Sequence, residues 1–225
     1  MALLEYRDVW KRYTEARYVL RSVNLRLEEG SLIVVVGPNG SGKTTLLKIG
    51  AGILRPSRGE ALVRGVNARL PPAKRWLGVI LHEPMVYPEL SIYENLKYYA
   101  GLRGIDEPLG EGLAKEAFEE LGLGKYRDRR VEELSFGWRR RTDIVRALLG
   151  GPVVILVDEP FTGLDPEARR GLASVFRKHL ERGGAILATT PLGGADIEFM
   201  VASNLRPEVY RISGGGLEHV GSPTG

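Results

Sequence analysis

The sequence predicts an α/β fold with a largely parallel sheet, an N-terminal antiparallel β subdomain and a small helical lobe. Short apolar, β-branched runs recur at residues 31–36, 76–81, 153–157 and 185–188, and helical segments separate them. Strands that alternate with helices are typical of parallel sheets with right-handed crossovers. The chain is long enough to bury a sizeable core, either as one large domain or as two small lobes.

The N-terminal segment contains two stretches in which apolar and polar residues alternate, at 4–9 and 23–27. Such alternation indicates half-exposed antiparallel strands, and we expect a polar turn at 11–17 between them. Tyr13 and Tyr18 lie in or near this turn. An aromatic ring there can stack on a nucleotide base or pack on the surface, and the residues alone favour surface packing.

A glycine-rich turn follows the run at 31–36 and precedes a helical segment. It contains Gly37, Gly42, Lys43 and Thr44 at the spacing of the phosphate-binding P-loop, G-x-x-x-x-G-K-[ST]. Glycines let successive backbone N–H groups face a phosphate, and the helix N-terminus adds partial positive charge. In this motif the lysine contacts the β- and γ-phosphates and the hydroxyl binds Mg²⁺. The other residues expected to line this site are Pro38, Asn39, Gly40, Ser41 and Thr45.

The middle of the chain predicts a strand at 60–66 and then a helical lobe. Ser91 and Glu94 fit a capping box, and Leu113, Ala117 and Leu121 share one helical face. The α/β pattern resumes afterwards, so we expect a single domain over residues 1–225. Residues 1–83 and 150–225 are expected to form its α/β core, and residues about 84–149 its helical insertion.

The run at 153–157 ends in Asp158 and Glu159. Acidic residues at the end of a buried strand are natural partners of a P-loop: Asp158 would hold Mg²⁺ and Glu159 would polarise the attacking water. Asp165 and Pro166 then predict a helix start. A strand follows that ends at Thr190, and glycines 214–216 predict a C-terminal hairpin.

Composition excludes several classes of site. The chain has no cysteine, which rules out disulfides and thiolate metal sites. We expect neither a membrane span nor a signal peptide. A net charge of +4 with dispersed basic residues suits a polyanionic ligand or a position beside a membrane. The chain also lacks glutamine and is rich in arginine and glutamate, a bias associated with thermophilic proteins.

Four stretches, at 37–45, 134–141, 155–160 and 163–166, resemble the ATP-binding-cassette (ABC) ATPases in order and spacing. The resemblance covers essentially the whole chain. It implies a P-loop NTPase core and a nucleotide-binding subunit of an ABC transporter, with ATP and Mg²⁺ as ligands. Membrane-spanning subunits would be its partners on the cytoplasmic, inner face of the cell membrane, and no nucleic acid is expected. Two cassettes would enclose two ATP molecules head to tail.

The resemblance also assigns roles to individual residues. Catalysis is assigned to Glu159 and Lys43. The metal site is assigned to Thr44, Asp158 and His82. Nucleotide contacts are assigned to Tyr13, which would stack on adenine, to the P-loop residues 37–45 and to Thr190. The signature that faces the other subunit's P-loop is Ser135, Phe136 and Gly137, and Asp165 would lie at the dimer seam.

Four positions depart from the family pattern. His82 and Trp138 stand at positions where the family usually has glutamine. Because this chain contains no glutamine, another residue must occupy both positions. Phe136 replaces a signature glycine, and Thr190 replaces the switch histidine. Threonine is shorter than histidine and never cationic, so it predicts a weaker γ-phosphate contact. We therefore expect ATP binding to be better preserved than fast hydrolysis.

Three functions remain open at this point. The chain is a transport ATPase acting as a homodimer, a catalytically weak regulatory half of a heterodimer, or a soluble ABC ATPase outside transport. The stretch 87–96 resembles export-type cassettes. The surface at 82–93 is a candidate docking site for a membrane subunit, and ordinary packing explains it equally well.

Overall fold

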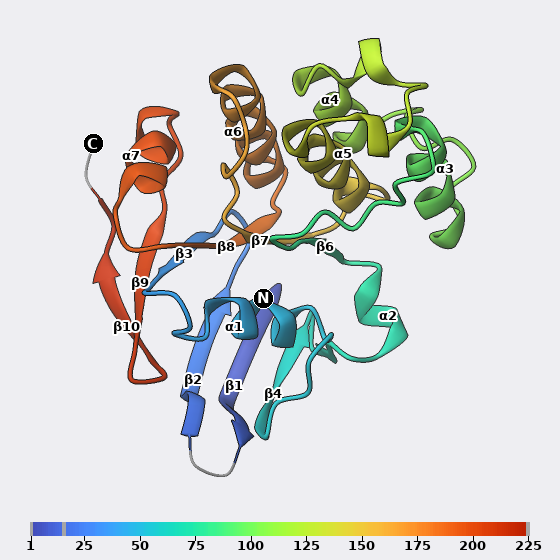
Figure 1. Cartoon of the computed structure of the whole chain (residues 1–225). Helices are drawn as coiled ribbons and strands as arrows, with labels where there is room; N and C mark the ends of the chain where they lie inside the picture. The colour runs from blue at the N-terminus through green and yellow to red at the C-terminus, as the bar shows by residue number, and fades with distance from the viewer. Residues whose placement is uncertain (1, 15–16, 224–225) are drawn as a thin grey trace.

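A six-stranded sheet runs through the centre of the part of the chain that the structure describes, residues 2–14 and 17–223 of a computed structural model (Figure 1). It is parallel except for the terminal hairpin strand β10, which pairs antiparallel with β9. Its strands in spatial order are β10 (Gly216–Gly221), β9 (Glu208–Ser213), β3 (Leu32–Val36), β8 (Ala185–Thr190), β7 (Val154–Asp158) and β6 (Leu77–Ile80). The predicted parallel sheet and C-terminal hairpin are confirmed.

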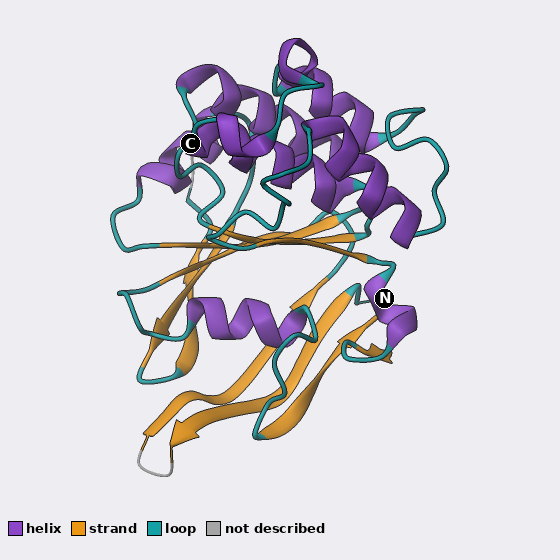
Figure 2. Ribbon diagram, turned by 45° about the vertical axis from the view of Figure 1, so that its right-hand side comes forward, coloured by secondary structure: helices purple, strands orange, loops and turns teal. Residues whose placement is uncertain are grey.

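Helices cover both faces of this sheet (Figure 2). Side chains alternate between faces along a strand, so on β3 Leu32, Val34 and Val36 pack in one apolar cluster while Ile33 and Val35 pack in another. The first cluster includes residues of α3 (Ile92–Leu102), α4 (Leu113–Glu120), α5 (Phe136–Leu148), α6 (Pro166–Glu181) and α7 (Ala195–Ala202). The second cluster includes α1 (Lys43–Gly50), which lies between the two sheets of the molecule.

The second sheet is antiparallel, as predicted, and its strands in order are β2 (Arg17–Leu27), β1 (Leu4–Thr14), β4 (Arg58–Val63) and β5 (Val66–Asn67). The expected turn at 11–17 was wrong over most of its length, because β1 continues to Thr14 and β2 begins at Arg17. Residues 15 and 16 of that turn lie outside the described residues. The polar side chains stay exposed on this protruding ribbon, so their polarity is compatible with strand structure.

The expected single strand at 60–66 is also a hairpin. Arg64 and Gly65 both have positive φ, 49° and 78°, which is the backbone of a two-residue turn between β4 and β5. Three further short elements are α2 (Pro71–Lys74) and the 3₁₀ helices Leu123–Tyr126 and Val131–Glu133. Among the described residues, none of the helices is long and apolar enough to cross a membrane.

Helix starts follow the predicted chemistry. The backbone N–H of Glu94 donates to Ser91 Oγ at 3.1 Å, and the Ser91 N–H donates to the Glu94 carboxylate at 2.8 Å, which completes the capping box of α3. The Asp165 carboxylate accepts from the Ala168 N–H at 2.9 Å and caps α6.

Strand β6 lies at the edge of the parallel sheet, and arginine side chains bind its outward carbonyl groups. Arg103 donates to Leu77 O at 3.0 Å and Arg146 donates to Val79 O at 2.6 Å. Arg140 donates to Leu81 O, the next carbonyl in this alternating row. We call Arg103, Arg146 and Arg140 the arginine ladder. It joins α5, and the C-cap residue of α3, to the edge of the sheet.

Candidate nucleotide-binding site

The glycine-rich turn lies between the end of β3 at Val36 and the start of α1 at Lys43, as the sequence predicts. Gly42 has a φ of 110°, and a Cβ atom there would approach the Val19 carbonyl oxygen at 3.0 Å. Both observations require glycine at this position. The turn therefore presents its backbone at the N-terminus of α1, where N–H groups and the helix dipole favour an anion.

Lys43 is buried at the base of this turn. Its ammonium donates to Gly37 O at 2.7 Å and to Pro38 O at 3.0 Å. Burial lowers the pKa of Lys43, and the charges of Asp158 and Glu159 oppose this shift. Ser41 Oγ is buried too and has no hydrogen-bond partner among the described residues. A buried hydroxyl without a partner beside a buried cation fits a phosphate ligand.

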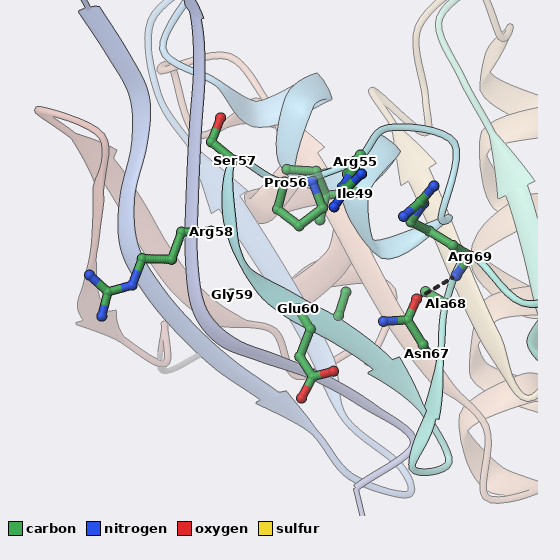
Figure 3. A pocket seen from close by; sticks show the side chains of 11 residues that line it. Ile49, Arg55, Pro56, Ser57, Arg58, Gly59, Glu60, Asn67, Ala68 and Arg69 are labelled. Atoms are coloured by element: carbon green, nitrogen blue, oxygen red, sulfur yellow. Dashed lines mark hydrogen bonds between the residues drawn. The ribbon is translucent and has the colours of Figure 1, made fainter.

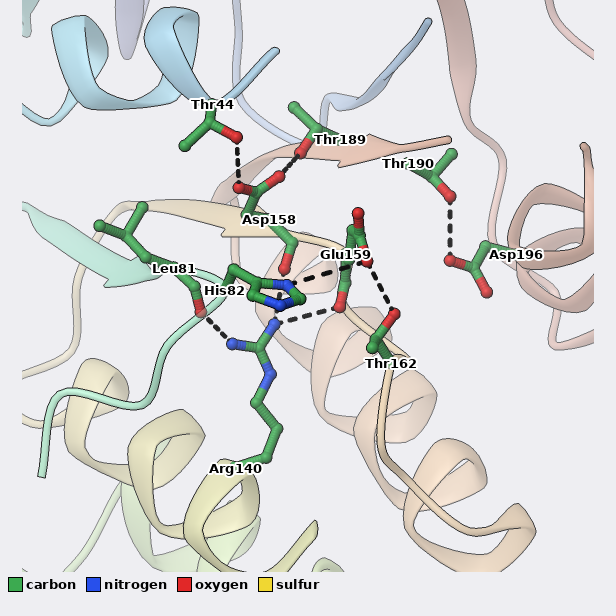
Figure 4. Close-up of polar contacts among 10 residues, drawn as sticks. All are labelled: Thr44, Leu81, His82, Arg140, Asp158, Glu159, Thr162, Thr189, Thr190 and Asp196. Carbon is green, nitrogen blue, oxygen red and sulfur yellow. Dashed lines mark hydrogen bonds and ion pairs between the residues drawn. The ribbon is translucent and has the colours of Figure 1, made fainter. Parts of the chain in front are cut away.

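Thr44 and Asp158 lie in direct contact, although 114 positions separate them in the sequence. The Thr44 hydroxyl donates to Asp158 Oδ2 at 2.7 Å (Figure 4). The other carboxylate oxygen accepts from the hydroxyl of Thr189, which stands beside Asp158 in the pairing of β7 with β8. Thr189 is not among the predicted site residues; the only sequence signal for it is its place at the end of the strand that precedes Thr190.

The donors at this point suit Mg²⁺ bound together with a nucleotide. Within the described residues, no group of three or more His, Cys, Asp or Glu side chains is arranged to hold a metal ion. Thr44 and Asp158 provide oxygen atoms alone, and Mg²⁺ typically takes one or two protein oxygens plus phosphates and waters. The residues therefore fit a magnesium ion that arrives with a triphosphate.

Glu159 follows Asp158 with a φ of 48°, a left-handed backbone that is uncommon for a residue with a side chain. Its N–H donates to Thr189 O at 2.9 Å, and its carboxylate accepts from the Thr162 hydroxyl at 3.1 Å. His82 lies beside it, with Nδ1 4.0 Å from Glu159 Oε2 and 62% of its side chain exposed. The structure thus brings His82 to Glu159, whereas Thr44 contacts Asp158.

Lys43, Thr44, Asp158 and Glu159 line a cavity of about 490 Å³, within the size range of small-molecule sites, whereas His82 is absent from its described lining. Its lining residues are Tyr13, Val19, Asn39, Gly40, Gly42, Lys43, Thr44, Thr45, Asp158 and Glu159. Tyr13 lies on strand β1, is 61% exposed, and forms a hydrogen bond of 3.1 Å with Thr45 Oγ1. A smaller cavity of about 340 Å³ lies near β4 and β5, and its described lining, residues 49, 55–61 and 67–69, contains no residue of these motifs (Figure 3).

Thr190 is oriented toward a different partner. Its hydroxyl donates to Asp196 Oδ2 at 3.0 Å, and Asp196 Oδ1 lies 3.1 Å from an Arg169 nitrogen. The Arg169 guanidinium in turn lies over the rings of Phe161 and Phe199. Thr190 is absent from the described lining of the P-loop cavity.

The predicted signature residues form the start of α5 and lie outside the described lining of that cavity. Ser135 occupies the N-cap position of α5 without a side-chain capping hydrogen bond, and Phe136 is 44% exposed. A Cβ on Gly137 would lie 2.7 Å from Gly163 O, so glycine is needed for this close packing. Asp165, in the same loop as Gly163, binds Arg141. The Ala168 N–H and the Arg141 charge hold the pKa of Asp165 below its usual value.

Comparison with known proteins identifies the family. The family model described as ABC transporter matches residues 20–162. The chain belongs to this family. An ABC transporter ATP-binding protein of Pyrococcus abyssi is 36% identical over 192 residues, which cover 84% of this ABC ATPase and 74% of that relative. The spermidine/putrescine import ATP-binding protein PotA of Spiroplasma citri is 32% identical over 98% of this chain and 62% of its own length.

Solved structures agree with this family. A structure described as an ATP-binding subunit of an ABC transporter matches 97% of this ABC ATPase with a TM-score of 0.84 and 27% identity. A dimeric ATP-binding cassette in a post-hydrolysis state, bound to ADP and Pi, matches 98% with a TM-score of 0.78. At 23% identity the second match shows the fold alone. The predicted fold class and family are therefore confirmed. The ABC ATPase spans about three-fifths of the length of two curated relatives, PotA and the sn-glycerol-3-phosphate import ATP-binding protein UgpC of Burkholderia mallei.

Proposed function

We propose that this ABC ATPase is the ATP-binding and hydrolysing subunit of a transporter, and that ATP-driven dimerisation energises transport. One observation carries the proposal: the Thr44 hydroxyl lies 2.7 Å from the Asp158 carboxylate inside the P-loop cavity. A P-loop hydroxyl and a strand-end aspartate are the two protein groups that hold Mg²⁺ in this class of site. Glu159 lines the same cavity.

The residues have distinct roles in this proposal. Lys43 exchanges the carbonyl oxygens of Gly37 and Pro38 for the β- and γ-phosphate oxygens, and Tyr13 stacks on adenine at the mouth of the cavity. Thr44 and Asp158 would hold Mg²⁺, which would supply positive charge beside the phosphates. Glu159 accepts a proton from the attacking water, and its contact with Thr162 keeps the carboxylate oriented.

The signature acts on a second cassette. Ser135 and Gly137 lie at the N-terminus of α5, where a helix dipole favours an anion, and they lie outside the described lining of their own cavity. We propose that they close over the partner's ATP in a head-to-tail dimer, with Asp165 at the seam. Residues 1–83 and 150–225 would form the core of each cassette and about 84–149 the helical subdomain that carries the signature.

Membrane-spanning subunits complete the assembly, which places the ATPase on the cytoplasmic face of the membrane. Tyr87 and Tyr98 are exposed and pack edge to face with ring centroids 5.1 Å apart, a surface suited to a partner with an apolar segment. Tyr93, on the first turn of α3, stacks against Arg127. Exchanging Tyr87 and Tyr93 for Ala in the complete transporter should uncouple transport and spare ATP binding. Unchanged transport would contradict this docking surface.

The direction of transport stays a prediction. The stretch 87–96 favours export, whereas the curated relatives PotA and UgpC are described as import proteins.

A second function is favoured by one specific contact. Because the Thr190 hydroxyl donates to Asp196, its proton is committed to a protein group in this conformation. A chain with a weak γ-phosphate contact suits the catalytically weak half of a heterodimer, which binds ATP and lends its signature to a partner cassette.

Hydrolysis of Mg-ATP by the isolated protein, measured against protein concentration, separates the two functions. The matched variants are Glu159→Gln and, as a control on the exposed end of α6, Glu181→Gln. A rate that depends on Glu159 and rises more steeply than linearly with concentration is expected for a competent homodimer. ATP binding with a rate no higher than that of Glu159→Gln would refute the homodimeric ATPase and favour the regulatory half.

A further inference from the structure

We propose that Arg140 is a positioning residue for Glu159. It holds the backbone on both sides of the catalytic carboxylate and fixes that backbone relative to the end of β6. The inference rests on the proposed ATPase function, but its structural part can be tested without hydrolysis.

The Arg140 side chain is 1% exposed and extends from α5 to the ends of two neighbouring strands (Figure 4). Nη2 donates to Asp158 O at 2.6 Å and to Glu159 O at 3.1 Å. Nη1 donates to Leu81 O. One guanidinium therefore binds both peptide groups that flank Glu159 and the peptide group that leads into His82. A planar fork of donors can bridge two strand ends, whereas a single ammonium cannot keep the same geometry.

The Glu159 backbone needs such support, because its φ of 48° is unfavourable for a residue with a Cβ atom. Its N–H is fixed by Thr189 O at 2.9 Å, and its carbonyl oxygen is bound by Arg140 and, at 3.3 Å, by the Thr162 N–H. The contacts at both ends determine where the side chain leaves the backbone. Loss of the Arg140 contacts would let the peptide relax and rotate the carboxylate away from the cavity.

Arg103, another member of the arginine ladder, covers the edge of β6 without contacting the backbone of Glu159. It therefore allows the positioning of Glu159 to be distinguished from coverage of the strand edge. Arg103 likewise binds two carbonyl oxygens, Leu77 O and Leu149 O, at 3.0 and 2.9 Å. Its hydrogen bonds go to main-chain groups remote from Asp158 and Glu159. Arg103→Lys is therefore the control, since it removes a similar two-carbonyl fork, half-buried where that of Arg140 is buried, without touching the carboxylate.

Hydrogen–deuterium exchange of the full-length protein tests the structural part. In Arg140→Lys the amides of Glu159 and Thr162 should exchange at least about tenfold faster than in the wild type, because their surroundings open locally. In Arg103→Lys these two amides should exchange at the wild-type rate. Unchanged exchange in a folded Arg140→Lys protein would overturn the proposal. If this variant does not fold, Arg140→Gln, which buries no charge, replaces it.

Steady-state kinetics test the consequence for hydrolysis. Arg140→Lys should lower kcat at least about tenfold and change the KM for ATP less than about threefold, since phosphate contacts are retained. Combined with Glu159→Gln, it should lower the residual rate less than about twofold, because Arg140 acts through Glu159. An equal loss in both backgrounds would show a role independent of Glu159 and overturn the proposal. A wild-type rate independent of Glu159 would refute the proposed function, and the exchange experiment would still decide the role of Arg140.

Discussion

The hydroxyl of Thr190 donates a hydrogen bond to Oδ2 of Asp196, 3.0 Å away. A threonine hydroxyl has one proton to donate, so this bond must break before Thr190 can donate to a γ-phosphate. Asp196 is itself fixed by Arg169, whose guanidinium lies over the rings of Phe161 and Phe199. The energy gained at the phosphate is therefore offset by the energy lost at Asp196, and the net contribution of Thr190 to catalysis is expected to be small.

Removing this hydroxyl tests that conclusion. Thr190→Val should lower kcat by less than about threefold, which corresponds to about 0.7 kcal/mol of transition-state stabilisation. Thr189→Val removes a hydroxyl from the neighbouring position that contacts Asp158, and it should cost more than about tenfold. Steady-state ATP hydrolysis measures both. The opposite order would show that Thr190 leaves Asp196 and contacts the phosphate.

The contact of Thr44 with Asp158 predicts a specific dependence on Mg²⁺. ATP with Mg²⁺ should raise the melting temperature more than ATP with EDTA, because the metal ion tightens ATP binding to the folded protein. For scale, a ligand at 100 times its Kd stabilises the folded state by about 2.7 kcal/mol. Thr44→Val should abolish the difference between the two conditions and retain the effect of ATP in EDTA. Thr44→Ser keeps the hydroxyl and should restore the difference. A difference that persists in Thr44→Val would exclude Thr44 from the metal site.

The loop before α6 leaves no room beside the signature helix. A Cβ on Gly163 would lie 2.6 Å from the Phe136 ring, and the φ of 76° at Gly163 is itself unfavourable for alanine. Gly163→Ala should lower the free energy of unfolding by about 2 kcal/mol in the wild type and by about 1 kcal/mol in Phe136→Ala, where the backbone strain alone remains. Urea denaturation of the four proteins measures this coupling. Equal losses in both backgrounds would show that the ring moves aside freely.

His179 predicts a pH dependence of stability. Burial lowers the pKa of this imidazole, and its hydrogen bond to Ala185 O, at 3.3 Å, opposes the shift only in part. The unfolded chain therefore binds a proton more readily than the folded protein. The stabilisation is complete above the ordinary histidine pKa of about 6.5 and is lost as the pH falls toward the lower folded-state pKa.

His179→Gln removes the titration and retains an amide near the Ala185 carbonyl. Unfolding free energies measured by denaturant at pH 5 to 7.5 should fall with decreasing pH in the wild type. The slope attributable to His179 is at most about 1.4 kcal/mol per pH unit, and it should be missing from the variant. Identical slopes in the two proteins would refute the assignment to His179.

The sequence could predict the P-loop and the Asp158–Glu159 pair because their chemistry is local. A buried strand, glycines at fixed spacing and a following lysine determine the turn without reference to the rest of the chain. Thr189 and Arg140 could not be assigned roles in the same way. Thr189 acts on Asp158 through strand pairing over 31 positions, and Arg140 binds carbonyl groups up to 59 positions away. Residues 139–141 are all arginine, and nothing in the sequence indicates which of these side chains is buried against main-chain oxygens.

Strand lengths were predicted least well, because the end of β1 at 11–14 and the start of β2 at Arg17 are mostly polar and lack the apolar alternation that indicates a strand. The sequence shows that His82 and Thr190 differ from the residues usual in the family, and the structure shows which residues they contact. His82 lies beside Glu159 and Thr190 beside Asp196, which sequence spacing does not indicate.

The arginine ladder has a consequence for how the protein unfolds. The carbonyl groups of Leu77, Val79 and Leu81 are bound by Arg103, which directly follows α3, and by Arg146 and Arg140 of α5. These outward carbonyl groups therefore have their partners only when the helical layer is in place. Detaching those helices would expose three carbonyls and an unprotected strand edge, which is an aggregation hazard. We therefore expect the helices and this edge of the sheet to unfold together, and detachment of the helices to favour intermolecular strand pairing.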